Sequence, residues 1–512
     1  MRVLLVNPNR EHMPWPTIPV GLCTVASAAE AGGHEVRVLD LSFAKDLAAE
    51  VDQALSWGPE VVGITIRNLD NCNFEMPEFF LTEVRDQIVK TLRRRAPEAV
   101  VVVGGSAVNV SPGDVFSYLE ADYALVGEGE EAFVAFLSAL SRGQDVGRVP
   151  GVLSAETKSP ERLPVLDTGR LLPGEPRAGR AVVKDLERAV RSRAFRWVDI
   201  PRYREAGTPY PIQTKRGCAL KCVYCVYNNI EGHAYRLRDP ADVVDEIEEA
   251  AAHGVTSFDF VDSTFNLPLS HARALCDELE KRKLGVDLST MGLNPAGVTP
   301  ELVASMKRAG FSSVMCTPES ASETTLRTLG KGFSKKIVER AARALRQAEL
   351  PTYWFFMLGA PEETIETVRE TLAFCEEHIP AEHMVLFSTG IRVYAGTPLE
   401  RLCKETGWFD ADDPLFFPSW YFSPELDIDE LYDTLAQASD RHPNWMTNAE
   451  TVLSLRAATF MKRAFRFVGW EGPFWLHLPK VFRVSGLLGA RSKGLRQIAE
   501  RLRAVPDVAH HQ

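Results

Sequence analysis

Apolar and polar positions alternate along the first 145 residues in short runs that predict strands separated by helices. The strands are expected at residues 3–6, 35–39, 61–66, 100–103 and 123–126. The helical patterns lie at residues 20–31, 45–55, 78–95, 112–119 and 130–140. Parallel strands need crossover connections, so this alternation predicts an α/β fold with a doubly wound parallel sheet. Such a sheet binds ligands at the carboxyl ends of its strands.

A second alternating region begins near residue 210, beyond a proline-rich stretch that is predicted to be a connector. Pro150, Pro160, Pro164, Pro173 and Pro176 interrupt any long element in that stretch. The later strands are expected at residues 211–214, 257–262, 286–291, 313–317, 352–358 and 384–393, with helices between them. Six strand–helix repeats predict a partial (β/α)6 barrel of the TIM type, because a complete eightfold barrel typically needs about 250 residues.

The last part of the chain is expected to be mostly helical. Amphipathic helices are predicted at residues 455–468 and 487–502, and residues 456–512 carry 11 Lys and Arg against 3 Asp and Glu, a net charge of +8. This basic character indicates either a solvated helix face or a peripheral contact with a membrane surface or an acidic substrate. The predicted units are therefore 1–145, a connector at 146–205, a barrel at 206–400 and a helical region at 401–512.

Composition narrows the functional classes. The 512 residues include 58 Lys and Arg and 69 Asp and Glu, which gives a net charge of −11 and argues against general nucleic-acid affinity. No apolar stretch approaches the roughly 20 residues of a membrane-spanning helix, and no signal-peptide core is present, so a cytoplasmic location is expected. The nine cysteines are then expected to be free thiols rather than disulfides.

Three of these cysteines cluster directly after the first expected barrel strand. Cys218, Cys222 and Cys225 have the spacing C-x3-C-x2-C and follow Gly217. Structural zinc sites usually have four ligands in two pairs, and no second pair lies near these three. Three thiolates instead fit three irons of a [4Fe–4S] cluster, with the fourth iron open to an external ligand.

The cysteine loop, with Tyr224 between its last two cysteines, resembles that of the radical S-adenosylmethionine (SAM) enzymes. The resemblance implies that Cys218, Cys222 and Cys225 hold the cluster and that its open iron binds SAM. Glu319 and Ser320, after the fourth barrel strand, resemble the residues that contact SAM in that family. Asp262 and Ser263, after the second strand, resemble its contacts to the SAM amino group, although a simple turn explains them equally well.

The first 145 residues contain Gly127-Glu128-Gly129-Glu130-Glu131-Ala132, which fits a dinucleotide-binding pattern but follows the wrong strand. This half instead resembles the Rossmann-like cobalamin-binding domain of one branch of radical SAM enzymes. The residues expected to contact cobalamin are Thr65, Arg67, Asn68, Gly104, Gly105, Ser106, Gly127, Glu128 and Gly129. The D-x-H-x-x-G motif that supplies a cobalt-ligating histidine is absent from the sequence, so Arg67 and Asn68 are candidates to cover the lower face of cobalamin.

The combined resemblance implies a cobalamin-dependent radical SAM C-methyltransferase acting on a small-molecule substrate. Its cofactors would be a [4Fe–4S] cluster, SAM and cobalamin, and a flavodoxin- or ferredoxin-type protein would supply single electrons. Oxidation, cyclisation or ring rearrangement without methyl transfer is an open alternative, as is a non-catalytic corrinoid carrier or sensor. The sequence does not identify catalytic groups, and Tyr227, Arg392 and Tyr394 are the candidates.

Overall fold

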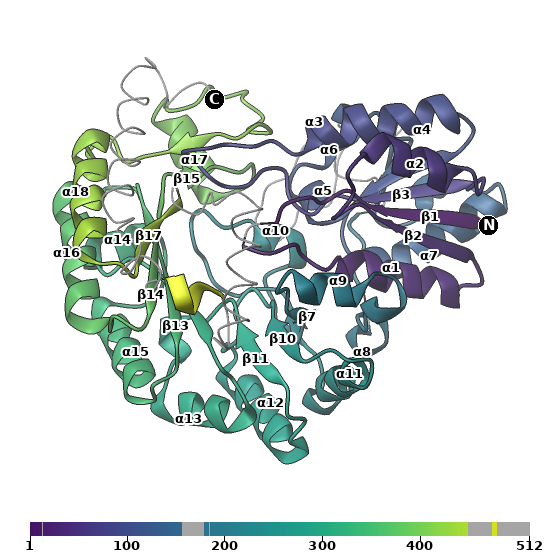
Figure 1. Cartoon of the computed structure of the whole chain (residues 1–512). Coiled ribbons are helices and arrows are strands. Elements are labelled where there is room, and N and C mark those ends of the chain that lie inside the picture. Colours follow the sequence, from purple (N-terminus) through teal and green to yellow (C-terminus); the bar gives the residue numbers. More distant parts are fainter. Residues whose placement is uncertain (13, 156–178, 184, 449–473, 479–512) are drawn as a thin grey trace.

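The computed structural model describes residues 1–12, 14–155, 179–183, 185–448 and 474–478 (Figure 1). Two α/β regions lie side by side in Figure 1, with the amino-terminal one in purple and blue and the second in teal and green. This order confirms the predicted fold class. The two basic helices predicted at residues 455–468 and 487–502 lie outside the described residues.

The amino-terminal region is a six-stranded sheet with the order β2-β1-β3-β4-β5-β6. Its strands are β1 (Arg2–Asn7), β2 (Glu35–Asp40), β3 (Val61–Thr65), β4 (Val100–Gly104), β5 (Tyr123–Leu125) and β6 (Val152–Ser154). The first five are parallel, as predicted, and β6 pairs antiparallel with β5. Strand β6 comes from the stretch predicted to be a connector, because its three residues are too short for a sequence pattern.

Helices separate the strands of this sheet. They are α1 (Val20–Ala31), α2 (Leu47–Leu55), α3 (Leu81–Glu83), the π-helical turn η1 (Val84–Val89), α4 (Lys90–Arg95), α5 (Ser106–Val110), α6 (Pro112–Tyr118) and α7 (Gly129–Ser141). The strand order reverses between β1 and β3, and a doubly wound sheet opens a crevice at the carboxyl ends of the strands at such a point.

The second region is a partial barrel of parallel strands. The strands are β7 (Tyr210–Ile212), β10 (Ser257–Phe260), β11 (Asp287–Thr290), β12 (Val314–Glu319), β13 (Thr352–Leu358), β14 (Met384–Thr389) and β17 (Trp445–Thr447). They pair in the orders β11-β10-β7 and β12-β13-β14-β17, and a bridge between Leu293 and Cys316 joins the two sets. Strand β17 extends the six predicted strands from a segment that was expected to be helical.

Helices cover the outside of this barrel. They are α11 (Pro240–Ala252), α12 (Leu269–Arg282), α13 (Pro300–Ala309), α14 (Glu323–Thr328), α15 (Lys335–Gln347), α16 (Ile365–His378) and α18 (Ile428–Arg441). Their buried residues and the outward side chains of the strands, such as Phe258 and Trp354, form the largest apolar core. No helix in the described part of the chain is long and apolar enough to cross a membrane.

The contact between the two regions is rich in buried charge. The hairpin of β8 (Lys215–Arg216) and β9 (Arg236–Leu237) faces the start of α7. Arg216 donates a 2.5 Å hydrogen bond to Glu130, and Arg236 forms an ion pair with Glu128. The side chains of Glu128 and Glu130 are only 8% and 5% exposed, so each carboxylate depends on its arginine for compensation.

Candidate functional site

The cysteine loop follows β7 and the β8 strand, at the carboxyl end of the barrel. Gly217 has a φ of +89°, and a Cβ there would lie 2.0 Å from the carbonyl oxygen of Ala234, so glycine allows the loop to pass close to its neighbour. Cys218 and Cys222 are buried, whereas Cys225 is half-buried. The Cys218 N–H donates to Gly232 and the Val223 N–H donates to Leu329, both at 3.0 Å, and these bonds fix the loop.

The three thiols lie near enough to affect one another's ionisation. The pKa of Cys225 is raised to about 12, mainly by burial and in part by the neighbouring Cys222 and Cys218. A tetrahedral zinc ion would draw thiolates to within about 4 Å of each other, because Zn–S bonds are about 2.3 Å long. Among the described residues no three His, Cys, Asp or Glu side chains converge in the way that one ion requires. Three neighbouring thiols on one loop fit three separate irons of a cluster.

A buried lysine faces this loop from the turn that follows α14. Lys331 forms an ion pair with Glu319, and its amino group lies 3.4 Å from the Tyr224 hydroxyl. The positive charge of Lys331 lowers the pKa of Cys222, although burial raises that pKa overall. Glu319 has a φ of +60° at a break in the β12–β13 register, so the strand end turns its carboxylate toward the loop. The structure thus brings Glu319 to the cysteine loop, together with Lys331, which the sequence analysis did not assign to the site.

Two other residues expected at the SAM site make structural contacts with the protein. The Asp262 carboxylate accepts from the Thr214 N–H at 2.7 Å and from the Lys215 ammonium at 3.0 Å, and it is buried. It therefore braces the chain that enters the cysteine loop. Ser320 is fully buried, and its hydroxyl lies 3.2 Å from the Thr371 hydroxyl on α16. These contacts give Asp262 and Ser320 structural roles beside the cysteine loop, and their expected contact with SAM stays a prediction.

Ser263 lies closer to the cysteine loop. Its hydroxyl donates a 3.2 Å hydrogen bond to the carbonyl oxygen of Gly217, and its side chain is half-buried. Ser263 therefore supports the first turn of the cysteine loop, while part of its side chain stays exposed.

The residues expected to contact cobalamin divide into two groups. Thr65, Gly104, Gly105 and Ser106 lie at the carboxyl ends of β3 and β4. Gly105 has a φ of +102°, and a Cβ there would lie 2.5 Å from the Ile66 carbonyl oxygen, so glycine is required by the crossing of two chain segments. Ser106 begins α5 and is exposed at the edge of the sheet, where a ligand can reach it.

In the second group, Gly127 and Glu128 contact other parts of the protein, and Gly129 begins α7. A Cβ on Gly127 would lie 2.2 Å from the carbonyl oxygen of Ala181, because residues 179–183 cross at this point. Glu128 binds Arg236 and also accepts from the Val183 N–H at 2.5 Å. Burial raises the pKa of Glu128, but its arginine partners lower it. The pKa is therefore below its usual value. Glu128 therefore joins the two regions, and its expected contact with cobalamin stays a prediction.

Arg67 and Asn68 follow β3 at the point where the strand order reverses. Both line a cavity of ≈ 280 Å³ beside the end of β1, and both also line a larger cavity of ≈ 1260 Å³. Burial lowers the pKa of Arg67, whereas Tyr227 and Glu11 lie near enough to oppose that shift. Tyr227 begins α10 (Tyr227–Glu231) directly after the cysteine loop, and α10 packs against α5. The sheet edge and the cysteine loop therefore face one another.

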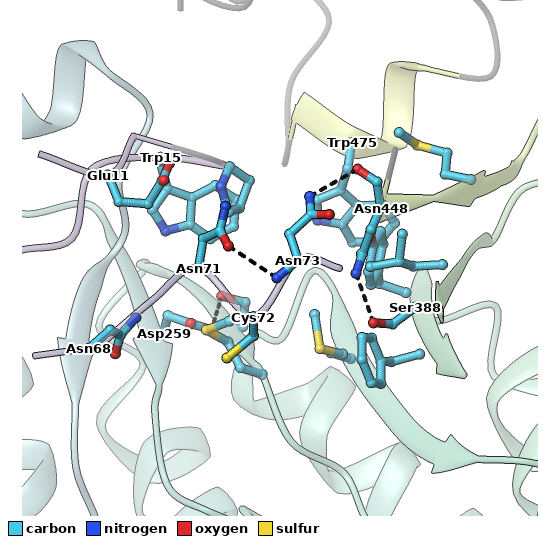
Figure 2. A pocket seen from close by; sticks show the side chains of 18 of the residues that line it. Glu11, Trp15, Asn68, Asn71, Cys72, Asn73, Asp259, Ser388, Asn448 and Trp475 are labelled. Carbon is cyan, nitrogen blue, oxygen red and sulfur yellow. Dashed lines mark hydrogen bonds between the residues drawn. The ribbon is translucent and has the colours of Figure 1, made fainter. Parts of the chain in front are cut away.

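The larger cavity connects this edge with the inside of the barrel (Figure 2). Arg67, Asn68 and the segment 71–73 border it from the amino-terminal region. Tyr224 borders it from the cysteine loop, and the inward side chains of β10 to β14 and β17 form its walls. Figure 2 shows Asn71, Cys72 and Asn73 in the centre of the view, with Trp15 and Trp475 on either side.

The remaining catalytic candidates lie at the border of this cavity and have protein partners. The Arg392 guanidinium binds Asp70 at 2.9 Å and donates to the carbonyl oxygens of Leu415 and Phe416. The Tyr394 hydroxyl lies 3.0 Å from the Cys72 thiol. Arg392 is therefore a clamp between the loop after β3 and the barrel, whereas Tyr394 faces the cavity. Sequence analysis missed Asp70 and Cys72 because a lone acid and a lone thiol after a strand give no pattern.

Comparisons with known proteins agree with this geometry. Residues 212–375 match the family model "Radical SAM superfamily", and residues 11–137 match the model "B12 binding domain". The chain is 26% identical over 421 residues to tryptophan 2-C-methyltransferase of Streptomyces laurentii, covering 72% of this chain and 69% of that protein. It is 25% identical to cytidylyl-2-hydroxyethylphosphonate methyltransferase of Streptomyces wedmorensis, covering 81% and 84%.

The structure is also similar to a solved structure. This is the radical S-adenosylmethionine methyltransferase TsrM from Kitasatospora setae with cobalamin and a [4Fe-4S] cluster bound. The TM-score is 0.78 at 25% identity, and the match covers 98% of this chain and 100% of that one. TsrM with tryptophan substrate and a SAM analog bound gives a TM-score of 0.76.

Proposed function

Because this chain belongs to the cobalamin-binding radical SAM enzymes, we propose that it is a C-methyltransferase that acts on an unactivated carbon of a small molecule. One observation carries the proposal. A single cavity of ≈ 1260 Å³ is bordered by Arg67 and Asn68 from the cobalamin-type sheet and by Tyr224 from the cysteine loop. A substrate in this cavity would contact both cofactor sites at once, as a methyl transfer to the substrate that uses both cofactors requires.

The cofactor sites follow from the placement of the side chains. We propose that Cys218, Cys222 and Cys225 hold a [4Fe–4S] cluster and that Glu319 and Ser263 border SAM. We assign Thr65, Arg67, Asn68, Gly104, Gly105 and Ser106 to the cobalamin side, with Gly129 at its margin. When bound, these groups supply the reductive cleavage of SAM and a methyl group carried on cobalt. The four predicted domain ranges remain our proposal for the boundaries.

The chain's own residues position these groups and exclude water. Lys331 neutralises Glu319 and lowers the pKa of Cys222. Asp262 holds the backbone that enters the cysteine loop. Arg67 would place a cation at the lower face of cobalamin, where it disfavours coordination by water or a base. Tyr394 and Tyr227 remain the candidates for contact with substrate, whereas Arg392 acts as a positioning residue.

An electron must reach the cluster from outside, so we propose a flavodoxin- or ferredoxin-type reductant as partner. We also propose a cytoplasmic location, because the nine cysteines are free thiols in this structure and a reduced iron–sulfur site requires a reducing compartment.

The central experiment is an anaerobic assay of the reconstituted enzyme with SAM that carries a deuterated methyl group. Candidate substrates are the metabolites that the enzymes encoded by neighbouring genes produce or consume. The product mass and the amount of S-adenosylhomocysteine are measured together. A labelled product supports methyl transfer. A product without label would favour oxidation or cyclisation, and no SAM cleavage under reduction would favour a corrinoid carrier.

A matched pair of variants tests the cluster assignment. Cys222→Ala is expected to lose most of the bound iron and sulfide and all SAM cleavage. Cys276→Ala replaces another buried thiol, which lies on α12 and far from the loop in sequence, and should keep both. Equal iron content in the two variants would contradict the assignment of the three cysteines.

The cobalamin side has its own test. Arg67→His replaces a cation with a group that can coordinate cobalt, so the absorption spectrum of bound cobalamin should change. Arg67→Lys keeps the charge and should keep the spectrum. An unchanged spectrum in Arg67→His would place Arg67 away from the cobalt.

A further inference from the structure

One wall of the large cavity is polar and acidic. Strand β10 contributes Ser257 and Asp259 to the lining, and β11 contributes Asp287 and Ser289. The parallel register places Ser257 beside Asp287 and Asp259 beside Ser289. The four side chains therefore form one continuous patch on the inner face of the barrel, and Figure 2 shows Asp259 among the side chains of this cavity.

Asp259 lacks the partners that a buried carboxylate usually has. The residue is only 4% exposed, and the Ser289 hydroxyl donates to one of its oxygens at 2.7 Å. Within the described part of the chain, no other donor and no Lys, Arg or His bonds to this carboxylate. Burial raises its pKa to about 7, because the charged form is poorly compensated. Buried carboxylates are normally paired, so the second oxygen is available to a bound molecule.

Among the described residues, none of the three arginines that border the cavity bonds to Asp259. Arg392 binds Asp70, and Arg204 donates to the carbonyl oxygen of Gly254 at 3.2 Å. Arg67 belongs to the sheet edge after β3. Burial also raises the pKa of Asp287, which is half-buried at the start of β11 in the same wall. In the described part of the chain, the polar wall therefore holds two carboxyl groups that no cation pairs with.

The facing wall is apolar. Strands β12, β13 and β17 supply its side chains, which are Met315, Tyr353, Phe355, Met357 and Met446. Methionine and aromatic side chains adapt to flat or irregular apolar surfaces. The cavity is therefore shaped for a molecule with one basic edge and one apolar face.

We propose that Asp259, supported by Asp287, binds a protonated amine of the substrate while the apolar body of the substrate packs against β12, β13 and β17. This inference rests on the proposed function, because it names the substrate class of the same cavity. The ammonium group donates to the free oxygen of Asp259, and Ser289 holds the other oxygen. The amine compensates the buried charge, which an alcohol of the same shape does only weakly.

The test compares two probes of nearly equal shape, naphthylmethylamine and naphthylmethanol, on the full-length enzyme loaded with cluster and cobalamin. Binding is measured by calorimetry at about pH 8, where the amine and an aspartate are both charged. A hydrogen bond between charged groups corresponds to roughly a tenfold preference or more, so the amine should bind at least about tenfold more tightly. Asp259→Asn should reduce this preference to less than about threefold.

The control is Glu301→Gln, which removes an exposed carboxylate on α13 (71% side-chain exposure) and should keep the preference. Equal binding of the two probes to the unaltered enzyme, binding of neither, or an unchanged preference in Asp259→Asn would each overturn the proposal. The unaltered enzyme tests it even if the variant does not fold.

S-adenosylhomocysteine formation is measured separately on the same preparation without probes. An enzyme that prefers the amine and forms no S-adenosylhomocysteine would refute the proposed function and keep the amine site. The reverse result would refute the amine site alone.

Discussion

The buried ion pair between Asp70 and Arg392 gives a quantitative test of how the two regions are joined. Asp70 lies on the loop after β3, and Arg392 lies in β15 (Ile391–Arg392) at the end of the barrel sheet. Their side chains are 0% and 3% exposed, and the nitrogen–oxygen distance is 2.9 Å. The perturbation is a double-mutant cycle of Asp70→Asn, Arg392→Met and the two together.

Removing one partner of a buried pair leaves an uncompensated charge and typically costs about 3–5 kcal/mol. Asp70→Asn should lower the free energy of unfolding by about 3 kcal/mol, because the guanidinium of Arg392 keeps its hydrogen bonds to Leu415 and Phe416. Arg392→Met should cost more stability than Asp70→Asn, because the Cys72 N–H is then the main remaining donor to the carboxylate of Asp70. The double variant carries no buried charge, so its cost should fall short of the sum by about 2–3 kcal/mol.

The assay is urea unfolding of cobalamin-loaded enzyme followed by tryptophan fluorescence, since Trp420 in β16 (Trp420–Tyr421) pairs with Arg392 in β15. The matched control is Arg308–Glu280, which has the same 2.9 Å separation but side chains 54% and 38% exposed. Its coupling should be below about 1 kcal/mol. A coupling for Asp70–Arg392 no larger than that of the control would refute the view that this pair clamps the regions together.

Three further outcomes follow from backbone geometry and burial. Gly127→Ala should destabilise the protein and expose residues 179–183 to proteolysis, because its Cβ would lie 2.2 Å from Ala181; Gly143→Ala, with φ of +63° and open space around it, should cost only about 1–2 kcal/mol. Asp259 has a raised pKa of about 7, so the unaltered protein should lose thermal stability relative to Asp259→Asn as pH rises from about 4 to 7, by at most about 1.4 kcal/mol per unit; a constant difference would contradict this. Burial lowers the pKa of His383 to about 4, so stability should fall as pH drops from about 6.5 to 4, and His383→Gln should flatten that melting profile.

The sequence predicted the long, strongly patterned elements of the fold well. The five parallel strands of the first sheet and the six barrel strands have apolar runs that burial on both faces requires. It missed β6 and β17, because three residues carry no periodicity and their pairing partners, such as Leu125 and Leu386, lie far away in the chain. Tertiary pairing, rather than local propensity, defines such strands.

The candidate site was predictable where chemistry is encoded by spacing. Cys218, Cys222 and Cys225 lie on one short loop, so their spacing alone brings them together. Polar residues after strands were less predictable, because a carboxylate at a strand end can face a ligand or brace the backbone. Asp262 bonds to Thr214 and Lys215, and only the folded structure reveals such partners.

The arginine–glutamate contacts between the β8–β9 hairpin and the start of α7 also bear on protein engineering. A chimera that grafts the amino-terminal half onto a foreign barrel would bring Glu128 and Glu130 without Arg236 and Arg216. Each orphaned carboxylate would then have to become protonated or find a new cation. A chimera that exchanges the amino-terminal region should therefore include the β8–β9 hairpin together with the sheet.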